Sequence, residues 1–222
     1  MFFLFSIAHT LLDDKLSILK HAYKNNQIEY YVSGTSKQII NGTLQLTKPE
    51  YAFDQVTKRY DWCSNCGKTK TDFPWIVLGI KNQIMNVKGY FLRVGCCYDS
   101  CCCEDYKNGC IHCCLFSWNF QISNDNKTWK TVHVVEGDYD MMRCSEKTYS
   151  FSETYRTRYV RLIQAGTCYS DPPCISLNKI EIIGTVGDGI ADGNQPEAPD
   201  ADDIDDDISI IGHISKNMNH NN

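Results

Sequence analysis

The fold of this chain is decided by four short segments: PWIVLG (residues 74–79), SNDNKTW (123–129), RYVRL (158–162) and NKIEIIG (178–184). They follow one another in this order, with an apolar, strand-like run before each turn. The SNDNKTW segment supplies Asn and Asp residues, which tolerate positive φ and bond to their own backbone, so we expect a β-hairpin there. Several short strands separated by such turns predict an all-β fold, an antiparallel β-sandwich or jelly roll.

The periodicity of the sequence supports this prediction. Residues 116–123 alternate strictly between apolar and polar side chains, and a period of two is typical of a half-buried strand. Tyr90, Leu92 and Val94 likewise alternate with Phe91 and Arg93. At 179–182 two isoleucines alternate with a lysine and a glutamate, which we expect on the polar face of a strand. The stretches 28–32 and 42–47 also look extended.

The four segments, together with Ala52-Phe53-Asp54 and Trp62, resemble the pattern of the discoidin family, also called the coagulation factor five/eight type C domain, which is galactose-binding-like. The resemblance covers residues 49–186. It implies a discoidin-type jelly roll that binds a ligand and is not an enzyme. Family members hold sugars, phospholipid headgroups or protein partners with loops at one end of the sandwich, so the loops must decide the function.

By this resemblance, the binding loops are residues 55–73, 95–114 and 137–147. Aromatic faces stack on sugar rings, while carboxylates and guanidinium groups hydrogen-bond to hydroxyls. The expected function is recognition of a carbohydrate or glycoprotein, an adhesion or lectin-like role. The alternative for each candidate residue is local packing or simple solvation. The candidate ligand-binding residues are Tyr60, Trp62, Tyr98, Tyr106, Asp138, Tyr139 and Arg143.

Three other functions are not expected. The histidines form no metalloprotease or nucleophile-elbow motif, and no glycine-rich loop has phosphate-binding spacing, so no catalytic residue is assigned. Residues 141–143 (Met-Met-Arg) could approach a membrane, but the flanking Asp138 and Asp140 oppose anionic lipid. Residues 1–186 hold 18 acidic and 21 basic residues without a basic cluster, which gives no basis for nucleic-acid binding.

No cofactor is expected either. Many sugar-binding members of the family carry a calcium site, built from oxygens of an early loop and a carboxylate on the last strand. Asp54 matches the early position, but Lys179 stands where the last-strand acid is expected, and an ammonium group cannot ligate a cation. Glu181 is the nearest alternative ligand.

Cysteine is unusually frequent, with 13 residues, eight of them between 96 and 114. The order of the segments makes 95–114 a loop between two strands. Disulfide bonds in an oxidising compartment are the first interpretation, and a local Cys168–Cys174 bond is expected. The alternatives are a zinc-thiolate cluster that includes His112, or reduced thiols in an intracellular protein-interaction domain. The disulfide candidates are Cys63, Cys66, Cys96, Cys97, Cys101, Cys102, Cys103, Cys110, Cys113, Cys114, Cys144, Cys168 and Cys174.

The two ends of the chain differ from its middle. Residues 1–12 could be a signal peptide; alternatively, a helix begins after Thr10 and carries leucines at helical spacing. Residues 10–48 are expected to hold this helix and an extension. Residues 187–222 hold nine acidic residues and a single lysine, and such a composition predicts a disordered acidic tail.

Two sequons, at Asn41 and Asn126, would accept N-glycans in a secreted protein. Together with the cysteine content, they predict a secreted or cell-surface location, with a cytoplasmic location as the alternative.

Overall fold

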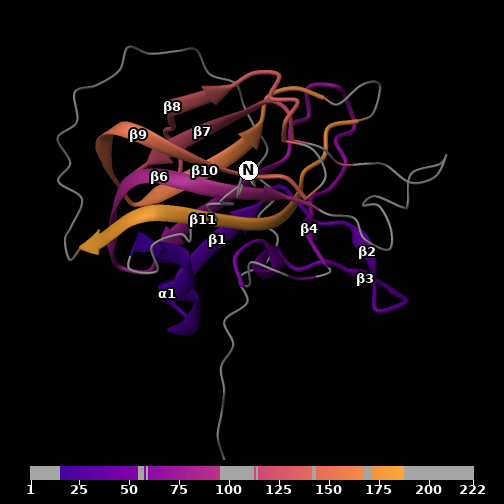
Figure 1. Cartoon of the computed structure of the whole chain (residues 1–222), viewed down its shortest axis with the longest axis horizontal. Coiled ribbons are helices and arrows are strands. Elements are labelled where there is room, and N and C mark those ends of the chain that lie inside the picture. The colour runs from indigo at the N-terminus through magenta and orange to yellow at the C-terminus, as the bar shows by residue number, and fades with distance from the viewer. Residues whose placement is uncertain are drawn as a thin grey trace, which may run out of the picture. The chain divides into compact units, whose positions relative to one another are not determined.

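The computed structural model of the chain describes residues 16–54, 58, 60–95, 113, 115–141, 144–167 and 172–187. These residues form two antiparallel β-sheets that face each other, with one short α-helix beside them (Figure 1). The predicted all-β sandwich with an N-terminal helix is therefore confirmed. The predictions of a signal peptide at 1–12 and of an acidic tail beyond residue 187 lie outside the described residues.

The first sheet has the order β1-β5-β10-β7-β8, with strands Ile28–Val32, Trp75–Ile80, Tyr159–Gln164, Trp118–Ser123 and Lys130–Val135. The second has the order β4-β11-β6-β9, with strands Trp62–Cys63, Ser176–Gly187, Ile84–Val94 and Glu146–Thr157. A separate hairpin pairs β2 (Lys37–Ile40) with β3 (Thr43–Leu46). The helices are α1 (Ile18–Lys24) and the 3-10 helix η2 (Pro49–Ala52). None of the described helices is long and apolar enough to cross a membrane.

The four segments quoted from the sequence take up the expected positions. PWIVLG forms most of β5 and RYVRL most of β10, and the two strands pair with Val160 opposite Leu78. SNDNKTW joins β7 to β8, and NKIEIIG lies in β11 of the other sheet. Alternate side chains of β7 (Trp118, Phe120 and Ile122) are buried in the core, as their periodicity predicted.

Aromatic stacking and hydrogen bonds join the two sheets across the core. Tyr90 of β6 is fully buried and stacks on Phe120 of β7, with ring centroids 4.2 Å apart. Its hydroxyl accepts a hydrogen bond from Trp118 Nε1 at 2.9 Å and lies 2.7 Å from Nδ1 of His133 in β8. A buried aromatic hydroxyl with two partners holds the facing strands in one register.

The N-terminal segment is part of this sandwich. β1 pairs with the edge of β5, and α1 packs along β11, where Ser17 forms a bridge with Ile183. The helix begins after Ser17, so Thr10 is not its N-cap. A backbone N–H group in the first turn of α1 is instead bonded by a residue far away in the sequence. The Glu181 carboxylate accepts the N–H of Leu19 at 2.6 Å.

This packing corrects one expectation about the last strand. Lys179 and Glu181 face away from the core isoleucines, as predicted, yet each is only 2% exposed. The polar side of β11 is covered because α1 and the end of η2 pack against it. A strand that looked half-buried is therefore buried on both faces.

Candidate functional site

The predicted binding loops begin at the end of the sandwich that lies on the right in Figure 1, where β4 is drawn. Gly95, the residue after β6, donates its N–H to the carbonyl of Ser176 at the start of β11 (2.8 Å). Cys144 donates to Gly95 O (3.3 Å), which attaches the loop between β8 and β9 to the same place. Gly95, where the 95–114 loop begins, and Cys144, near the end of the β8–β9 loop, therefore lie side by side.

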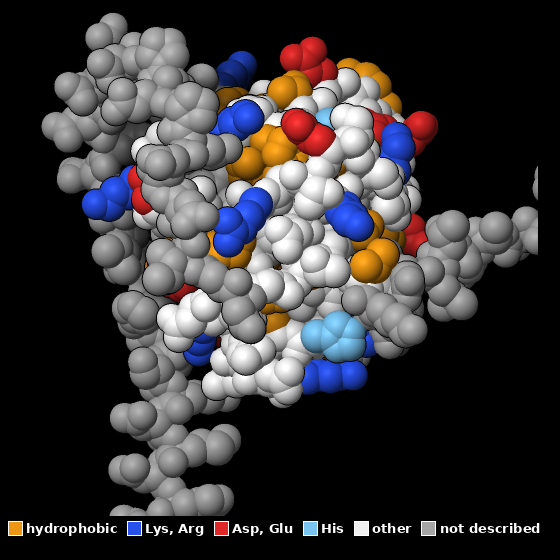
Figure 2. Space-filling model, turned by 90° about the vertical axis from the view of Figure 1, so that its left-hand side faces the viewer, with side chains coloured by type: hydrophobic (Ala, Val, Ile, Leu, Met, Phe, Trp, Pro, Cys, Tyr) orange, Lys and Arg blue, Asp and Glu red, His pale blue; other side chains and the backbone are white. Residues whose placement is uncertain are grey.

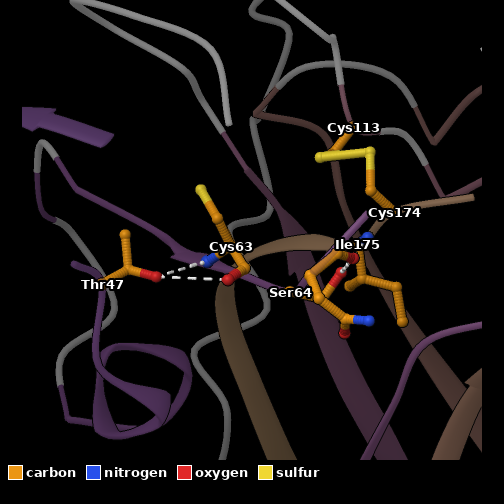
Figure 3. Close-up of a disulfide and its surroundings, with 7 residues drawn as sticks. Thr47, Cys63, Ser64, Cys113, Cys174 and Ile175 are labelled. Carbon is orange, nitrogen blue, oxygen red and sulfur yellow. Dashed lines mark hydrogen bonds between the residues drawn. A yellow bond between two sulfur atoms is a disulfide. The ribbon is translucent and has the colours of Figure 1, made fainter. Parts of the chain in front are cut away.

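A disulfide bond fastens this end. Cys113 is bonded to Cys174, with Cα atoms 5.0 Å apart, and joins the end of the cysteine-rich loop to the segment before β11 (Figure 3). Next to it, Ser64 N donates to Ile175 O (2.9 Å) and Ile175 N donates to Ser64 Oγ (2.8 Å), which prolongs the β4–β11 pairing. Cys63 N is held by Thr47 Oγ1 (3.1 Å).

Cys63, Cys66 and Cys144 also take part in disulfide bonds, so all five described cysteines are oxidised. This agrees with the first interpretation of the cysteines. The local Cys168–Cys174 bond was a wrong prediction, because Cys174 pairs with a cysteine 61 residues away. Eight other candidates lie outside the described residues: Cys96, Cys97, Cys101, Cys102, Cys103, Cys110, Cys114 and Cys168.

Two of the candidate ligand-binding residues are engaged in local packing. Trp62 is fully buried in the core and has no ring face open to a ligand, so its predicted role was wrong. Tyr60 packs its ring on Tyr51, with centroids 4.4 Å apart, and its hydroxyl lies 3.4 Å from Asp54 Oδ2. Tyr98, Tyr106 and Arg143 lie outside the described residues.

Tyr139 is different, because its ring is presented to solvent. Its exposed fraction is 69%, and one side of the ring contacts Phe116 with centroids 5.2 Å apart. The loop below is held by short-range bonds, among them Gly137 N to Ser117 Oγ (2.9 Å) and Asp138 N to Phe116 O (2.8 Å). Gly137 has a φ of +62°, which suits glycine at this tight turn.

The neighbouring Asp138 is oriented by two donors from the start of β9. Its Oδ2 accepts hydrogen bonds from Lys147 Nζ (2.8 Å) and from the Tyr149 hydroxyl (3.1 Å). Burial would raise the pKa of Asp138, but these two hydrogen bonds outweigh it and lower the pKa. The same hydrogen bond raises the pKa of Lys147. At neutral pH the residue directly before Tyr139 is therefore a carboxylate that is paired with an ammonium group.

We call Phe116, Asp138, Tyr139, Lys147 and Tyr149 the β8–β9 site. Sequence reasoning found Asp138 and Tyr139 but missed Lys147 and Tyr149. The available signal was their position, since they are the second and fourth residues of β9 and share one face of a strand that begins within the predicted loop 137–147.

The opposite end of the sandwich has a mixed surface. Figure 2 views it from the left-hand side of Figure 1, and hydrophobic side chains reach the surface there in separate groups with charged side chains between them. Scattered exposed apolar groups are ordinary for a soluble protein.

The residues around Asp54 do not fit a calcium ion. Lys179 Nζ donates to the carbonyl of Phe53 (2.8 Å), and Lys58 Nζ donates to the carbonyl of Tyr51 and to Asp54 Oδ1. The Glu181 carboxylate is occupied by backbone N–H groups. Calcium needs six to eight oxygen ligands, and here the oxygens already face ammonium groups. Among the described residues no group of three or more His, Cys, Asp or Glu side chains could hold a metal ion.

The strand order and the antiparallel pairing of the described residues are those of a discoidin-like β-sandwich. No protein-family model matches the chain, and no curated protein matches it.

Solved structures do match. One is a family 32 carbohydrate-binding module of Clostridium perfringens in complex with GalNAc-β-1,3-galactose, with a TM-score of 0.51, 12% identity and coverage of 76% of this chain and 99% of that chain. Another is a module of the same kind from a family 31 glycoside hydrolase of Clostridium perfringens, with a TM-score of 0.50, 12% identity and coverage of 72% and 92%. At this identity the likeness establishes the fold.

Proposed function

We propose that this chain is a non-enzymatic, carbohydrate-binding member of the discoidin family, and that it holds a sugar at the β8–β9 site. The observation that carries the proposal is the exposed ring of Tyr139, which directly follows Asp138 of the Asp138–Lys147 pair in the same loop. The similarity to carbohydrate-binding modules supports the same class of ligand.

The chemistry of the site suits a sugar. One face of a pyranose ring is apolar and stacks on an aromatic ring, while its hydroxyls need donors and acceptors at the rim. Tyr139 supplies the ring. Asp138 supplies charged acceptors and Lys147, whose side chain is 44% exposed, supplies donors. Hydrogen bonds with an ionised partner are the stronger kind, so these two groups would fix the orientation of the sugar.

The site is also prepared before binding. The Asp138 side chain is only 12% exposed and is already held by two donors, so little rotamer freedom remains to be lost. Phe116 supports Tyr139 from one side in the same way. A site that is ordered before binding loses less conformational entropy when it holds a sugar.

The oxidised state of Cys63, Cys66, Cys113, Cys144 and Cys174 favours an oxidising compartment, and with it a secreted or cell-surface location. Asn41 is exposed in the β2–β3 turn and Asn126 is half-buried in the β7–β8 turn, so both sequons lie on turns. The alternative, an intracellular interaction domain with reduced or zinc-bound cysteines, requires free thiols at these positions.

A glycan array with the intact, oxidised protein tests the proposal, followed by calorimetric titration of the sugars that bind. Tyr139→Ala should weaken binding roughly tenfold or more, since it removes the stacking platform. Tyr139→Phe keeps the ring and should stay within about twofold of the parent. Tyr23→Ala is the matched control, because Tyr23 is also exposed (41%) but lies on α1. An array without signal, or equal binding by all three variants, would contradict the proposal and favour a protein partner.

A further inference from the structure

Two lysine side chains are buried at the start of the last strand, where they meet a group of oxygen atoms. Lys58 is 9% exposed and Lys179 is 2% exposed. The oxygens come from the carbonyls of Tyr51 and Phe53 in and after η2, and from the carboxylate of Asp54. A buried ammonium group is costly unless it is paired and hydrogen-bonded, so both lysines require an account.

Each of the two ammonium groups has a backbone carbonyl and a carboxylate as partners. Lys58 Nζ donates to Tyr51 O and Asp54 Oδ1, and it lies 5.3 Å from the centre of the Tyr60 ring. Lys179 Nζ donates to Phe53 O at 2.8 Å and forms an ion pair with Glu181 Oε2 at 3.8 Å. Two cations therefore meet two carboxylates and two backbone carbonyls in one buried cluster.

The arrangement of these oxygens is the kind that a hard metal cation would use, since carbonyls and a carboxylate converge from one short segment onto the last strand. In this chain the positive charges that meet these oxygens are the ammonium groups of two lysine side chains. We infer that Lys58 and Lys179 are internal cations that take the place of a divalent metal ion, so that the sandwich closes without calcium.

Both ammonium groups fasten the η2 segment to other parts of the chain. Lys179 belongs to β11, 126 residues away from Phe53, and its bond ties the residue after η2 to the last strand. The Glu181 partner holds the first turn of α1 through the N–H groups of Leu19 and Lys20. Loss of Lys58 therefore removes an ammonium group from Asp54, loss of Lys179 removes one from Glu181, and we expect either loss to weaken the packing of α1 and η2.

The balance of charge in the cluster supports this role, because the two ammonium groups face the carboxylates of Asp54 and Glu181. Burial lowers the pKa of Lys179 to about 8, Glu181 opposes the shift and Lys58 adds to it. Burial also lowers the pKa of Lys58, against the hydrogen bond with Asp54. Burial likewise raises the pKa of Glu181, and the Coulomb attraction between Lys179 and Glu181 opposes both shifts and favours the charged forms.

The first test uses the unmodified, full-length chain and calcium chloride alone. Thermal unfolding is followed by circular dichroism in EDTA and in millimolar calcium. We expect the two melting temperatures to agree within about 1 °C. A chain that binds calcium at about 100 times its Kd would instead gain several degrees, and such a rise would overturn the inference.

The second test removes each ammonium group. Lys179→Met and Lys58→Met should each lower the melting temperature by roughly 5–15 °C, because a single buried charge is left without its partner. Lys88→Met is the matched control, since Lys88 is an exposed strand lysine on β6, and it should change the melting temperature by less than about 2 °C. If the two buried variants behave like the control, the lysines are not internal cations. The calcium measurement is independent of whether any variant folds.

Discussion

The indole N–H of Trp118 donates to the Tyr90 hydroxyl across the two sheets, with 2.9 Å between Nε1 and the oxygen. The same hydroxyl lies 2.7 Å from Nδ1 of His133 in the edge strand β8. In the neutral His133 tautomer with its proton on Nε2, the hydroxyl donates to Nδ1 and the chain Trp118–Tyr90–His133 is fully satisfied.

The first prediction follows from this chain of hydrogen bonds. Tyr90→Phe keeps the stacked ring but removes the hydroxyl, so the buried Trp118 N–H loses its acceptor. The free energy of unfolding should fall by about 1–3 kcal/mol, as measured by urea denaturation. Tyr139→Phe, which removes a hydroxyl from an exposed ring, serves as the control and should have little effect. Equal stability of the Tyr90→Phe chain and the parent would show that the bond is not formed.

The second prediction concerns pH. Burial lowers the pKa of His133 below its usual 6.5, so the unfolded chain takes up a proton before the folded chain does. The stability that neutral His133 contributes is therefore complete above about pH 6.5 and is lost as the pH falls through the folded-state pKa. Urea midpoints at about pH 7.5 and about pH 5 measure this loss, and His133→Gln should reduce it. An NMR titration of His133 with a pKa above 6.5 would contradict the assignment.

The third prediction concerns the β7–β8 turn. Burial would raise the pKa of Asp125, but the backbone N–H groups of Lys127 and Thr128 and the Ser123 hydroxyl outweigh it and lower the pKa to about 2. The stabilisation is present above about pH 4 and is lost as the pH falls towards 2. Asp125→Asn should abolish this part of the acid sensitivity while it keeps the shape of the side chain. Unchanged acid unfolding in that variant would assign the loss to other carboxylates.

The fourth prediction concerns the long-range disulfide. Peptide mapping without reduction should recover a peptide pair that joins Cys113 to Cys174. Cys174→Ser should cost about 4 kcal/mol of stability, since the bond closes a loop of 61 residues in the unfolded chain. Cys168→Ser is the control that separates this pairing from a local one. If its effect matched that of Cys174→Ser and the mapped pair were 168–174, the observed connectivity would be refuted.

The strands could be predicted from the sequence because, where one face of a strand is buried, apolar and polar residues alternate along it. Trp118, Phe120 and Ile122 alternate with polar residues and lie in the core as expected. Lys179 and Glu181 show where this reasoning fails. They alternate as surface residues do, and only the position of α1 and η2, set by contacts more than 120 residues apart, makes them buried.

The candidate site was predicted in part for a similar reason. Asp138 and Tyr139 were found because they belong to a loop that the family resemblance places at the binding end. Lys147 and Tyr149 were missed because their role depends on hydrogen bonds to Asp138 that periodicity does not encode. Trp62 was misjudged because a tryptophan in a loop segment looks available until β4 pairs with β11. Cysteine pairing likewise depends on which segments meet in space.

The antiparallel pairing of β1 with β5 has a practical consequence for anyone who divides this chain. A fragment that starts at residue 49, where the resemblance to the family begins, would lack β1 and leave those backbone N–H and C=O groups of β5 that face β1 unpaired along an open edge. Such an edge invites pairing with a second molecule. A fragment for expression or crystallisation should therefore include β1, the strand that pairs with β5, even though β1 lies outside the region that resembles the family.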